Sequence, residues 1–254
     1  MTEFLDTGVP DSPVRLVLAH GAGGAMTSSF LETIAALLAN RGIAVTRFEF
    51  AYMAARRTGG KRRPPPRAEL LVPEYRSAVE EVRQRLAKGQ ELLIGGKSMG
   101  GRVASLLADE LFTEGRISGL VCLGYPFHPP GKPDQLRTEH LVDLKTPALI
   151  VQGERDPFGS RAEVEQMALS PSIRVHWAGD GDHDLGPRGG KGFTRRGNLD
   201  AAADAVANFA KSLDQAAAGT GSGSGKRRGS SQTAIRMAPA APARTWNRRS
   251  KPQP

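Results

Sequence analysis

A glycine-flanked serine near the middle of the chain constrains the fold more than any other feature. Gly96 and Gly100 flank Ser98 in the pattern G-x-S-x-G, directly after the apolar run Leu92–Ile94. Downstream, apolar residues recur at helical spacing, at Val103, Leu106, Leu107 and Leu111. A strand, a tight turn and a helix in direct succession are typical of α/β folds, in which such turns lie at the carboxyl edge of a parallel sheet.

The residues alone admit three interpretations of this turn. The first is a plain glycine turn that only joins a strand to a helix. The second is a phosphate-binding loop, G-x-x-x-x-G-K-[ST], but it fails on spacing because position 91 is Glu91 and not glycine. The third is a nucleophile elbow, which holds the Ser98 hydroxyl exposed and points the backbone N–H of Met99 toward a developing oxyanion. Residues elsewhere in the chain are needed to distinguish the plain glycine turn from the nucleophile elbow.

Strand-like and helix-like patterns alternate along residues 1–214. Strands are predicted at residues 14–19, 43–50, 91–94, 117–123, 148–152 and 173–177. Besides the helix after the elbow, helices are predicted at residues 29–41, 73–88, 161–169 and 198–214. This order predicts an α/β fold with a mostly parallel sheet of about six strands, helices on both faces and no large lid domain. Ligands of such sheets bind beyond the carboxyl ends of the strands.

The charge of the chain is concentrated at its end. The net charge is +9, and residues 215–254 carry eight basic residues and no acidic one, which leaves +1 for residues 1–214. We therefore predict a folded domain over residues 1–214 and a disordered, basic Gly/Ser/Pro-rich tail over residues 215–254. A second basic, proline-rich segment at residues 55–67 is predicted to form a loop.

The remaining composition favours a cytoplasmic protein. Cys122 is the single cysteine, so no disulfide can form within the chain. The start, Met1–Asp6, lacks the basic and then apolar profile of a signal peptide. No apolar run approaches the ~18 residues that a membrane span requires.

A serine nucleophile needs a base, and His183 is the best-placed histidine. In elbow-type hydrolases the chain order is serine, then acid, then histidine. Of the histidines downstream of the elbow, His128 and His140 lie in the segment 125–144, and His176 lies inside the last strand. His183 follows that strand in a loop, where the carboxyl edge of the sheet is expected, and is therefore the predicted base.

The acid that orients the base is predicted at Asp156. This residue lies in the turn after the strand 148–152, and Glu154 in the same turn is the alternative. The acidic residues around His183 resemble the start of a calcium loop, but such a loop would need glycine at 185 and glutamate at 191, where the chain has Leu185 and Lys191. We therefore expect no metal and no cofactor.

The second oxyanion donor is expected in the glycine-rich loop after the first strand. There the backbone N–H of Ala22 can face that of Met99 across the site. Gly21 is expected to contact the substrate, and His128 is expected at the rim of the pocket. His20 is expected to be a buried, structural residue that ties loops together.

Five segments carry a family resemblance: His20–Gly24, Gly95–Arg102, Gly124–Pro133, Gly153–Gly159 and Gly181–His183. They resemble an α/β-hydrolase, most closely a small branch related to dienelactone hydrolases that includes testis-expressed and NSL-complex-subunit-like proteins. The similarity spans roughly residues 12–213. It implies the hydrolase fold and supports Ser98, Asp156 and His183 as a catalytic triad. It supplies no substrate. Dienelactone hydrolases use a cysteine nucleophile where this chain has Ser98, which argues against assigning their reaction to this chain.

The sequence therefore predicts a serine hydrolase that cleaves a small carboxylic ester or thioester through an acyl-enzyme. The alternative from another class is a hydrolase-fold binding module without catalysis. Weak, non-specific binding of a polyanion by the basic tail and the segment 56–67 is a further hypothesis. A tail that only keeps the chain in solution is the simpler alternative to it. The sequence does not predict an oligomeric state.

Overall fold

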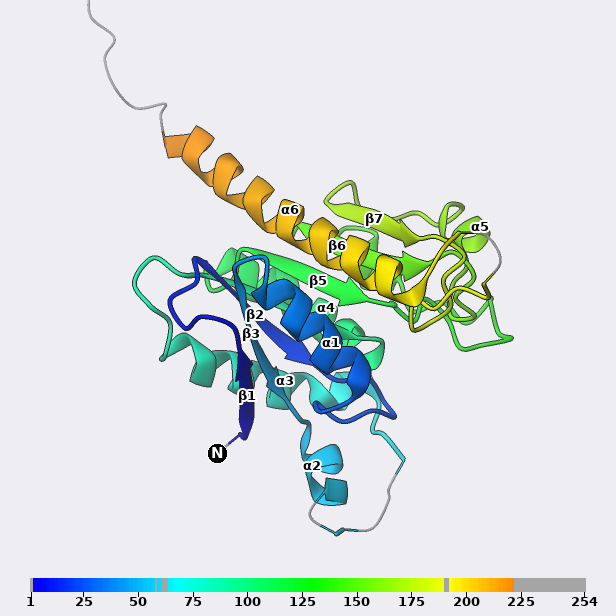
Figure 1. Ribbon diagram of the computed structural model, residues 1–254, viewed down its shortest axis with the longest axis horizontal. Coiled ribbons are helices and arrows are strands. Elements are labelled where there is room, and N and C mark those ends of the chain that lie inside the picture. Colours follow the sequence, from blue (N-terminus) through cyan, green and yellow to red (C-terminus); the bar gives the residue numbers. More distant parts are fainter. Residues whose placement is uncertain (1, 58, 61–63, 190–191, 222–254) are drawn as a thin grey trace, which may run out of the picture.

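A seven-stranded sheet forms the centre of the computed structural model, which describes residues 2–57, 59–60, 64–189 and 192–221. The strand order is β1-β3-β2-β4-β5-β6-β7, and helices cover both faces (Figure 1). The strands are β1 (Phe4–Thr7), β2 (Val14–Ala19), β3 (Ile43–Phe48), β4 (Glu91–Lys97), β5 (Gly119–Leu123), β6 (Ala148–Gly153) and β7 (Ile173–Ala178). The predicted α/β fold, a mostly parallel sheet with helices on both faces, is confirmed.

One strand was not predicted from the sequence. β1 pairs antiparallel with β3, whereas all other neighbouring strands pair in parallel. Its four residues are too few to show a clear apolar alternation, and as an edge strand it has only one hydrogen-bonded neighbour. Asp6 anchors it, because its carboxylate accepts hydrogen bonds from Thr46 and Arg15.

Two apolar layers hold the helices to the sheet. Along β4, Leu93 faces the layer covered by α1 (Ser29–Ala39) and α6 (Arg195–Gly221), which pack against each other. Leu92 and Ile94 face the opposite layer, under α3 (Ala68–Arg83) and α4 (Met99–Thr113). Side chains of a strand point alternately to its two faces, so a strand buried on both sides is apolar throughout.

Several boundaries differ from the predicted ones. α3 begins at residue 68 and holds Pro73 inside the helix, whereas the sequence suggested that a helix starts at this proline. The buried residues Leu71 and Tyr75 of α3 lie on either side of Pro73, so packing on the sheet outweighs the backbone hydrogen bond that proline removes.

Two segments expected to be irregular are partly helical. α2 (Ala51–Arg57) includes the first residues of the predicted loop 55–67. α6 continues to residue 221, seven residues past the predicted domain end, and residues 222–254 of the predicted tail lie outside the described residues. The two remaining helical segments are short: η1 (Glu139–Leu141) and α5 (Arg161–Val164). Among the described residues, no helix is long and apolar enough to cross a membrane.

Candidate active site

The carboxyl ends of four parallel strands bring the candidate site together. The loop His20–Gly24 follows β2, Ser98 follows β4, Asp156 follows β6 and His183 follows β7. These strands run parallel within one sheet, so their carboxyl ends meet at the same edge. This is the edge at which parallel α/β sheets bind their ligands.

Ser98 occupies a strained turn between β4 and α4. Its φ of 52° and ψ of −117° lie in a region that residues with a side chain rarely adopt. The two flanking glycines allow this turn to pack closely. A Cβ on Gly96 would lie 2.4 Å from the carbonyl carbon of Gly100, and one on Gly100 would lie 2.5 Å from the His20 carbonyl oxygen. The turn therefore has the geometry of a nucleophile elbow. A plain glycine turn between a strand and a helix would not need a serine in this strained conformation.

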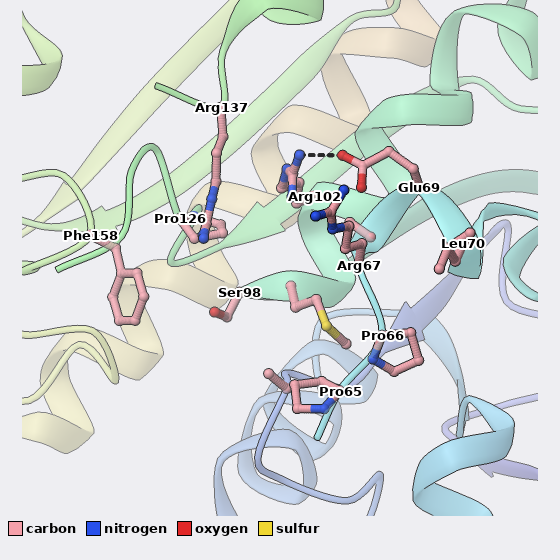
Figure 2. Close-up of a pocket in the computed structure, with 13 residues that line it drawn as sticks. Pro65, Pro66, Arg67, Glu69, Leu70, Ser98, Arg102, Pro126, Arg137 and Phe158 are labelled. Atoms are coloured by element: carbon pink, nitrogen blue, oxygen red, sulfur yellow. Dashed lines mark hydrogen bonds and ion pairs between the residues drawn. The ribbon is translucent and has the colours of Figure 1, made fainter. Parts of the chain in front are cut away.

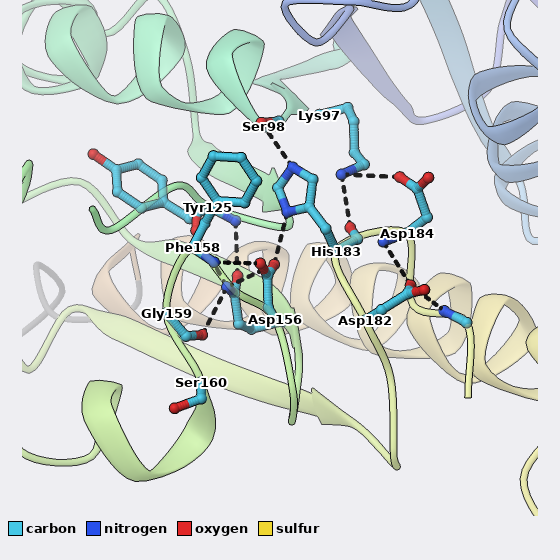
Figure 3. Close-up of polar contacts among 12 residues, drawn as sticks. Lys97, Ser98, Tyr125, Asp156, Phe158, Gly159, Ser160, Asp182, His183 and Asp184 are labelled. Atoms are coloured by element: carbon cyan, nitrogen blue, oxygen red, sulfur yellow. Dashed lines mark hydrogen bonds and ion pairs between the residues drawn. The ribbon is translucent and has the colours of Figure 1, made fainter. Parts of the chain in front are cut away.

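The predicted serine, histidine and aspartate form one hydrogen-bonded chain (Figure 3). Ser98 Oγ lies 2.9 Å from His183 Nε2, and His183 Nδ1 lies 2.8 Å from Asp156 Oδ2. Because the carboxylate can only accept, it assigns the proton of the neutral imidazole to Nδ1. Nε2 is then free to accept the proton of the serine hydroxyl.

Asp156 is held by donors on both oxygens. Its side chain is fully buried, and Oδ2 accepts a hydrogen bond of 2.9 Å from the side-chain amide of Gln152. Oδ1 accepts one of 2.9 Å from the backbone N–H of Phe158. The Phe158 ring packs on the imidazole of His183, with ring centroids 4.3 Å apart. The acid is therefore fixed in orientation, and one face of the base is shielded from water.

Lys97 supports the loop that carries the base. Its ammonium donates a hydrogen bond of 2.7 Å to the backbone carbonyl of His183 and lies 3.3 Å from Asp184 Oδ1. Burial lowers the pKa of Lys97, which the neighbouring carboxylates partly counteract. Gly124 leaves space for this contact, because a Cβ there would lie 3.0 Å from Lys97 Nζ and 2.9 Å from the His183 carbonyl oxygen.

His20 and Tyr52 hold the loop that follows β2. His20 is buried; its Nδ1 lies 2.6 Å from the Gly21 carbonyl oxygen, and its Nε2 accepts a hydrogen bond from the backbone N–H of Phe50. Burial lowers the pKa of His20, so the neutral imidazole is favoured. The Tyr52 hydroxyl donates to the Ala22 carbonyl at 3.1 Å. His20 is thus a structural residue, as the sequence predicts.

Two cavities meet at the nucleophile. The larger, of about 950 Å³, and the smaller, of about 370 Å³, share Ala22, Ser98 and Phe158 in their linings (Figure 2). Met99 lines the larger cavity, and as the first residue of α4 its N–H has no acceptor within the helix. Gly21 lines the smaller cavity, and a Cβ there would lie 3.6 Å from the Cβ of Ser98. The predicted oxyanion residues Ala22 and Met99 and the predicted contact residue Gly21 therefore lie beside Ser98.

Comparison with known proteins agrees with this geometry. Residues 12–211 match the model of a family described as an alpha/beta hydrolase domain. The chain belongs to the α/β-hydrolase family. Within the residues that the structure covers between β5 and β6, this hydrolase has only the short helix η1 and no helical lid.

Three solved structures illustrate the likeness of fold. A dienelactone hydrolase from Anabaena variabilis has a TM-score of 0.61 and 20% identity, and the match covers 82% of this chain and 90% of that one. A serine hydrolase homologue from Coxiella burnetii gives 0.59 and 18%, covering 82% and 90% of the two chains. A serine hydrolase without a lid from Xanthomonas campestris gives 0.57 and 19%, covering 83% and 88%.

The hydrolase does not bring every predicted residue to the site. His128, expected at the pocket rim, is only 2% exposed and lines neither cavity at Ser98. Its Nδ1 lies 2.9 Å from the Pro129 carbonyl, and its Nε2 lies 3.6 Å from Glu163 Oε2. His140 also lies away from the nucleophile and shares a hydrogen bond of 2.8 Å with Ser105. Neither histidine is placed to act on Ser98.

The acidic residues near His183 have structural partners. Glu154, the alternative acid, accepts a hydrogen bond from the backbone N–H of Asp180. Asp180 in turn pairs with Arg188 and Arg155, and these contacts, chiefly the hydrogen bonds from Arg188, lower its pKa to about 2. Asp182 caps a turn by accepting two backbone N–H groups. Among the described residues, no group of three or more His, Cys, Asp or Glu side chains is arranged to hold a metal ion.

Sequence reasoning missed the residues that line the wall of the larger cavity. Arg102, Arg137 and Phe158 lie there, and none of them is predicted as a site residue. Arg102 could have been found, because it lies four residues after Ser98 and so on the same face of α4. Arg137 belongs to an irregular segment that no periodicity places.

Proposed function

We propose that this hydrolase cleaves a carboxylic ester or thioester with Ser98 as the nucleophile. The observation that carries the proposal is the continuous hydrogen-bonded chain from Ser98 through His183 to the buried Asp156. A binding module has no need for a serine in a strained turn, an imidazole in the required tautomer and an orienting carboxylate together. The serine hydrolases from Coxiella burnetii and Xanthomonas campestris that share its fold support the same reaction class.

The reaction follows from the geometry. Ser98 Oγ attacks the acyl carbon while His183 Nε2 accepts the hydroxyl proton, and the carbon–oxygen π pair moves onto the carbonyl oxygen. The backbone N–H groups of Ala22 and Met99 donate to that oxyanion. Asp156 stabilises the charged imidazolium, which then protonates the departing alkoxide or thiolate as its bond to carbon breaks.

Water completes the cycle. His183 takes a proton from a water molecule as its oxygen attacks the acyl-enzyme, and the second tetrahedral intermediate collapses to release the carboxylic acid and regenerate Ser98. The two cavities that meet at Ser98 give separate spaces for the acyl group and the leaving group. Their combined size and the lack of a helical lid between β5 and β6 favour an accessible small molecule as substrate.

Active-site labelling tests this proposal. We expect a fluorophosphonate probe to label the protein at Ser98 only, and p-nitrophenyl esters or acyl thioesters of two to eight carbons to be hydrolysed. The Ser98→Ala variant should lose both labelling and turnover, with a typical loss of about 10⁶-fold in kcat for a triad serine. A folded native protein that neither reacts with the probe nor hydrolyses any substrate would favour the binding module.

A further inference from the structure

One wall of the larger cavity carries an excess of positive charge. The ionisable residues that line it are Arg67, Arg102, Arg137 and Glu69, which give the lining a net charge of +2. Figure 2 shows the three arginines on the same side of the cavity, across from Pro65 and above Ser98. The wall thus faces the nucleophile with more guanidinium groups than the one carboxylate can neutralise.

The carboxylate is already engaged by one of the arginines. Glu69 accepts a hydrogen bond of 2.5 Å from Arg102. The hydrogen bond to its own backbone and then the charge of Arg102 lower the pKa of Glu69. Arg102 Nε is buried without a hydrogen-bond partner among the described residues. Glu69 therefore satisfies part of Arg102, and its single charge leaves the lining with an excess of two positive charges.

Arg137 is the arginine best prepared to bind an anion. Its backbone is fixed on both sides, since its N–H donates to the Phe127 carbonyl at 2.8 Å and its carbonyl accepts from the Tyr125 hydroxyl at 2.9 Å. Its side chain extends toward Pro126 at the edge of the cavity (Figure 2). Within the described residues, its guanidinium has neither a hydrogen bond nor an ion pair.

The environment of Arg137 makes this unpaired charge costly. Burial, and next the positive charge of Arg102, lower the pKa of Arg137. The carboxylate of Glu69 counteracts only part of this effect, so a partly buried guanidinium close to another one remains unfavourable without a further anion. Arg67 at the start of α3 likewise has no ion-pair partner in the described part of the chain. An oxyanion between these groups would remove the imbalance.

The rest of the lining is apolar. Apart from the small residues Ala22, Ala68 and Ser98, it consists of Pro65, Pro66, Leu70, Met99, Pro126 and Phe158. A ligand that extends from Ser98 to the arginines therefore meets apolar side chains and can carry both an apolar stretch and a charged group. Guanidinium groups match carboxylate and phosphate oxygens because they can donate two parallel hydrogen bonds.

We propose that the larger cavity is an anion subsite, in which Arg137 and Arg67 bind a carboxylate or phosphate group carried by the ester or thioester substrate. This proposal rests on the proposed function, because it assumes an ester or thioester substrate. Its test does not depend on that function, because binding is measured without turnover. Arg137 and Arg67 then determine which substrates bind, while Ser98, His183 and Asp156 carry out the reaction.

Calorimetry on the Ser98→Ala variant measures the subsite directly. The probes are mono-p-nitrophenyl glutarate, which ends in a carboxylate, and its methyl ester, which has nearly the same shape and no charge. We expect the carboxylate to bind at least tenfold more tightly, and adding Arg137→Gln or Arg67→Gln should each remove most of that preference. Equal binding of the two probes, or a preference that both substitutions leave intact, would overturn the inference.

Matched variants separate the subsite from general charge and from folding. Arg174→Gln removes the same charge from an exposed arginine on β7, far from both cavities, and should leave the preference unchanged. Arg137→Lys keeps the charge but not the paired donors, so it should retain part of the preference. A probe that ends in a phosphonate, p-nitrophenyl 4-phosphonobutanoate, distinguishes a carboxylate substrate from a phosphate substrate. The probe whose charged group matches that of the natural substrate should bind more tightly.

Turnover by the native protein then distinguishes the two proposals. Hydrolysis of the neutral ester with no gain for the charged one would sink the subsite and leave the serine hydrolase intact. Charge-selective binding by Ser98→Ala without hydrolysis by the native protein would support the anion subsite and overturn the proposed hydrolase activity. Where both hold, kcat/KM for the charged ester should fall about tenfold in Arg137→Gln, while that for the neutral ester changes less than twofold.

Discussion

The strained backbone of Ser98 predicts that glycine at this position gives a more stable protein than alanine does. A residue with a Cβ held at φ 52° and ψ −117° costs on the order of 1–3 kcal/mol. Ser98→Ala and Ser98→Gly both remove the hydroxyl and its hydrogen bond to His183. Only glycine relieves the strain, whereas its larger freedom in the unfolded chain costs about 0.4–1 kcal/mol. The difference leaves Ser98→Gly more stable than Ser98→Ala by roughly 1 kcal/mol.

Differential scanning calorimetry measures this difference. A change of 1 kcal/mol shifts Tm by about 2–4 °C in a domain of 150–250 residues, so the glycine variant should melt that much above the alanine variant. Ser77, exposed within α3, is the control, because glycine there should melt lower than alanine by a similar amount. A Ser98→Gly variant that melts at or below Ser98→Ala would refute the argument that this turn stores strain.

Four further outcomes follow from the contacts described above. Asp156→Asn should lower kcat about 10⁴-fold, measured with p-nitrophenyl esters, because the amide favours the wrong tautomer of the base. His183→Ala should abolish turnover and His128→Ala should retain it; the reverse pattern would move the base. Lys97→Met should lower kcat about tenfold with KM unchanged, since the carbonyl of the base loses a charged donor at 2.7 Å; a fall in Tm alone would make this lysine structural only. Urea unfolding should show stability falling as pH decreases below about 6.5, because the pKa of buried His20 is lowered from 6.5 and the unfolded chain binds the proton more readily; constant stability between pH 7.5 and 5.5 would contradict this.

The chemistry-bearing residues could be predicted because each has a local signature. Ser98 is marked by its glycines, and the parallel strand order dictates that Asp156 and His183 follow their strands at the same edge. The sequence shows which residues follow a strand directly, and the parallel sheet places all such residues at the same edge. For this reason the hydrogen-bonded chain of these three residues could be predicted from the sequence.

Other features depend on packing that no local pattern encodes. α3 starts five residues before Pro73 because Leu71 can be buried against the sheet, and this gain exceeds the cost of an internal proline. Arg137 reaches the cavity only because an irregular segment is fixed through Tyr125 and Phe127. The burial of His128 likewise depends on how that segment folds back, which is why its expected place at the pocket rim differs from the observed one.

The antiparallel pairing of β1 bears on how the hydrolase behaves at high concentration. Without these four residues, the six-residue strand β3 would be the outer strand, and the backbone N–H and C=O groups on its free side would be open to another molecule. β1 covers that row with a strand too short to template further pairing, and Asp6 places a charge on it. The opposite margin, β7, carries the exposed Arg174. Short or charged margins of this kind oppose edge-to-edge aggregation. Deleting residues 1–7 should therefore promote self-association before it affects the chemistry at the far ends of the strands.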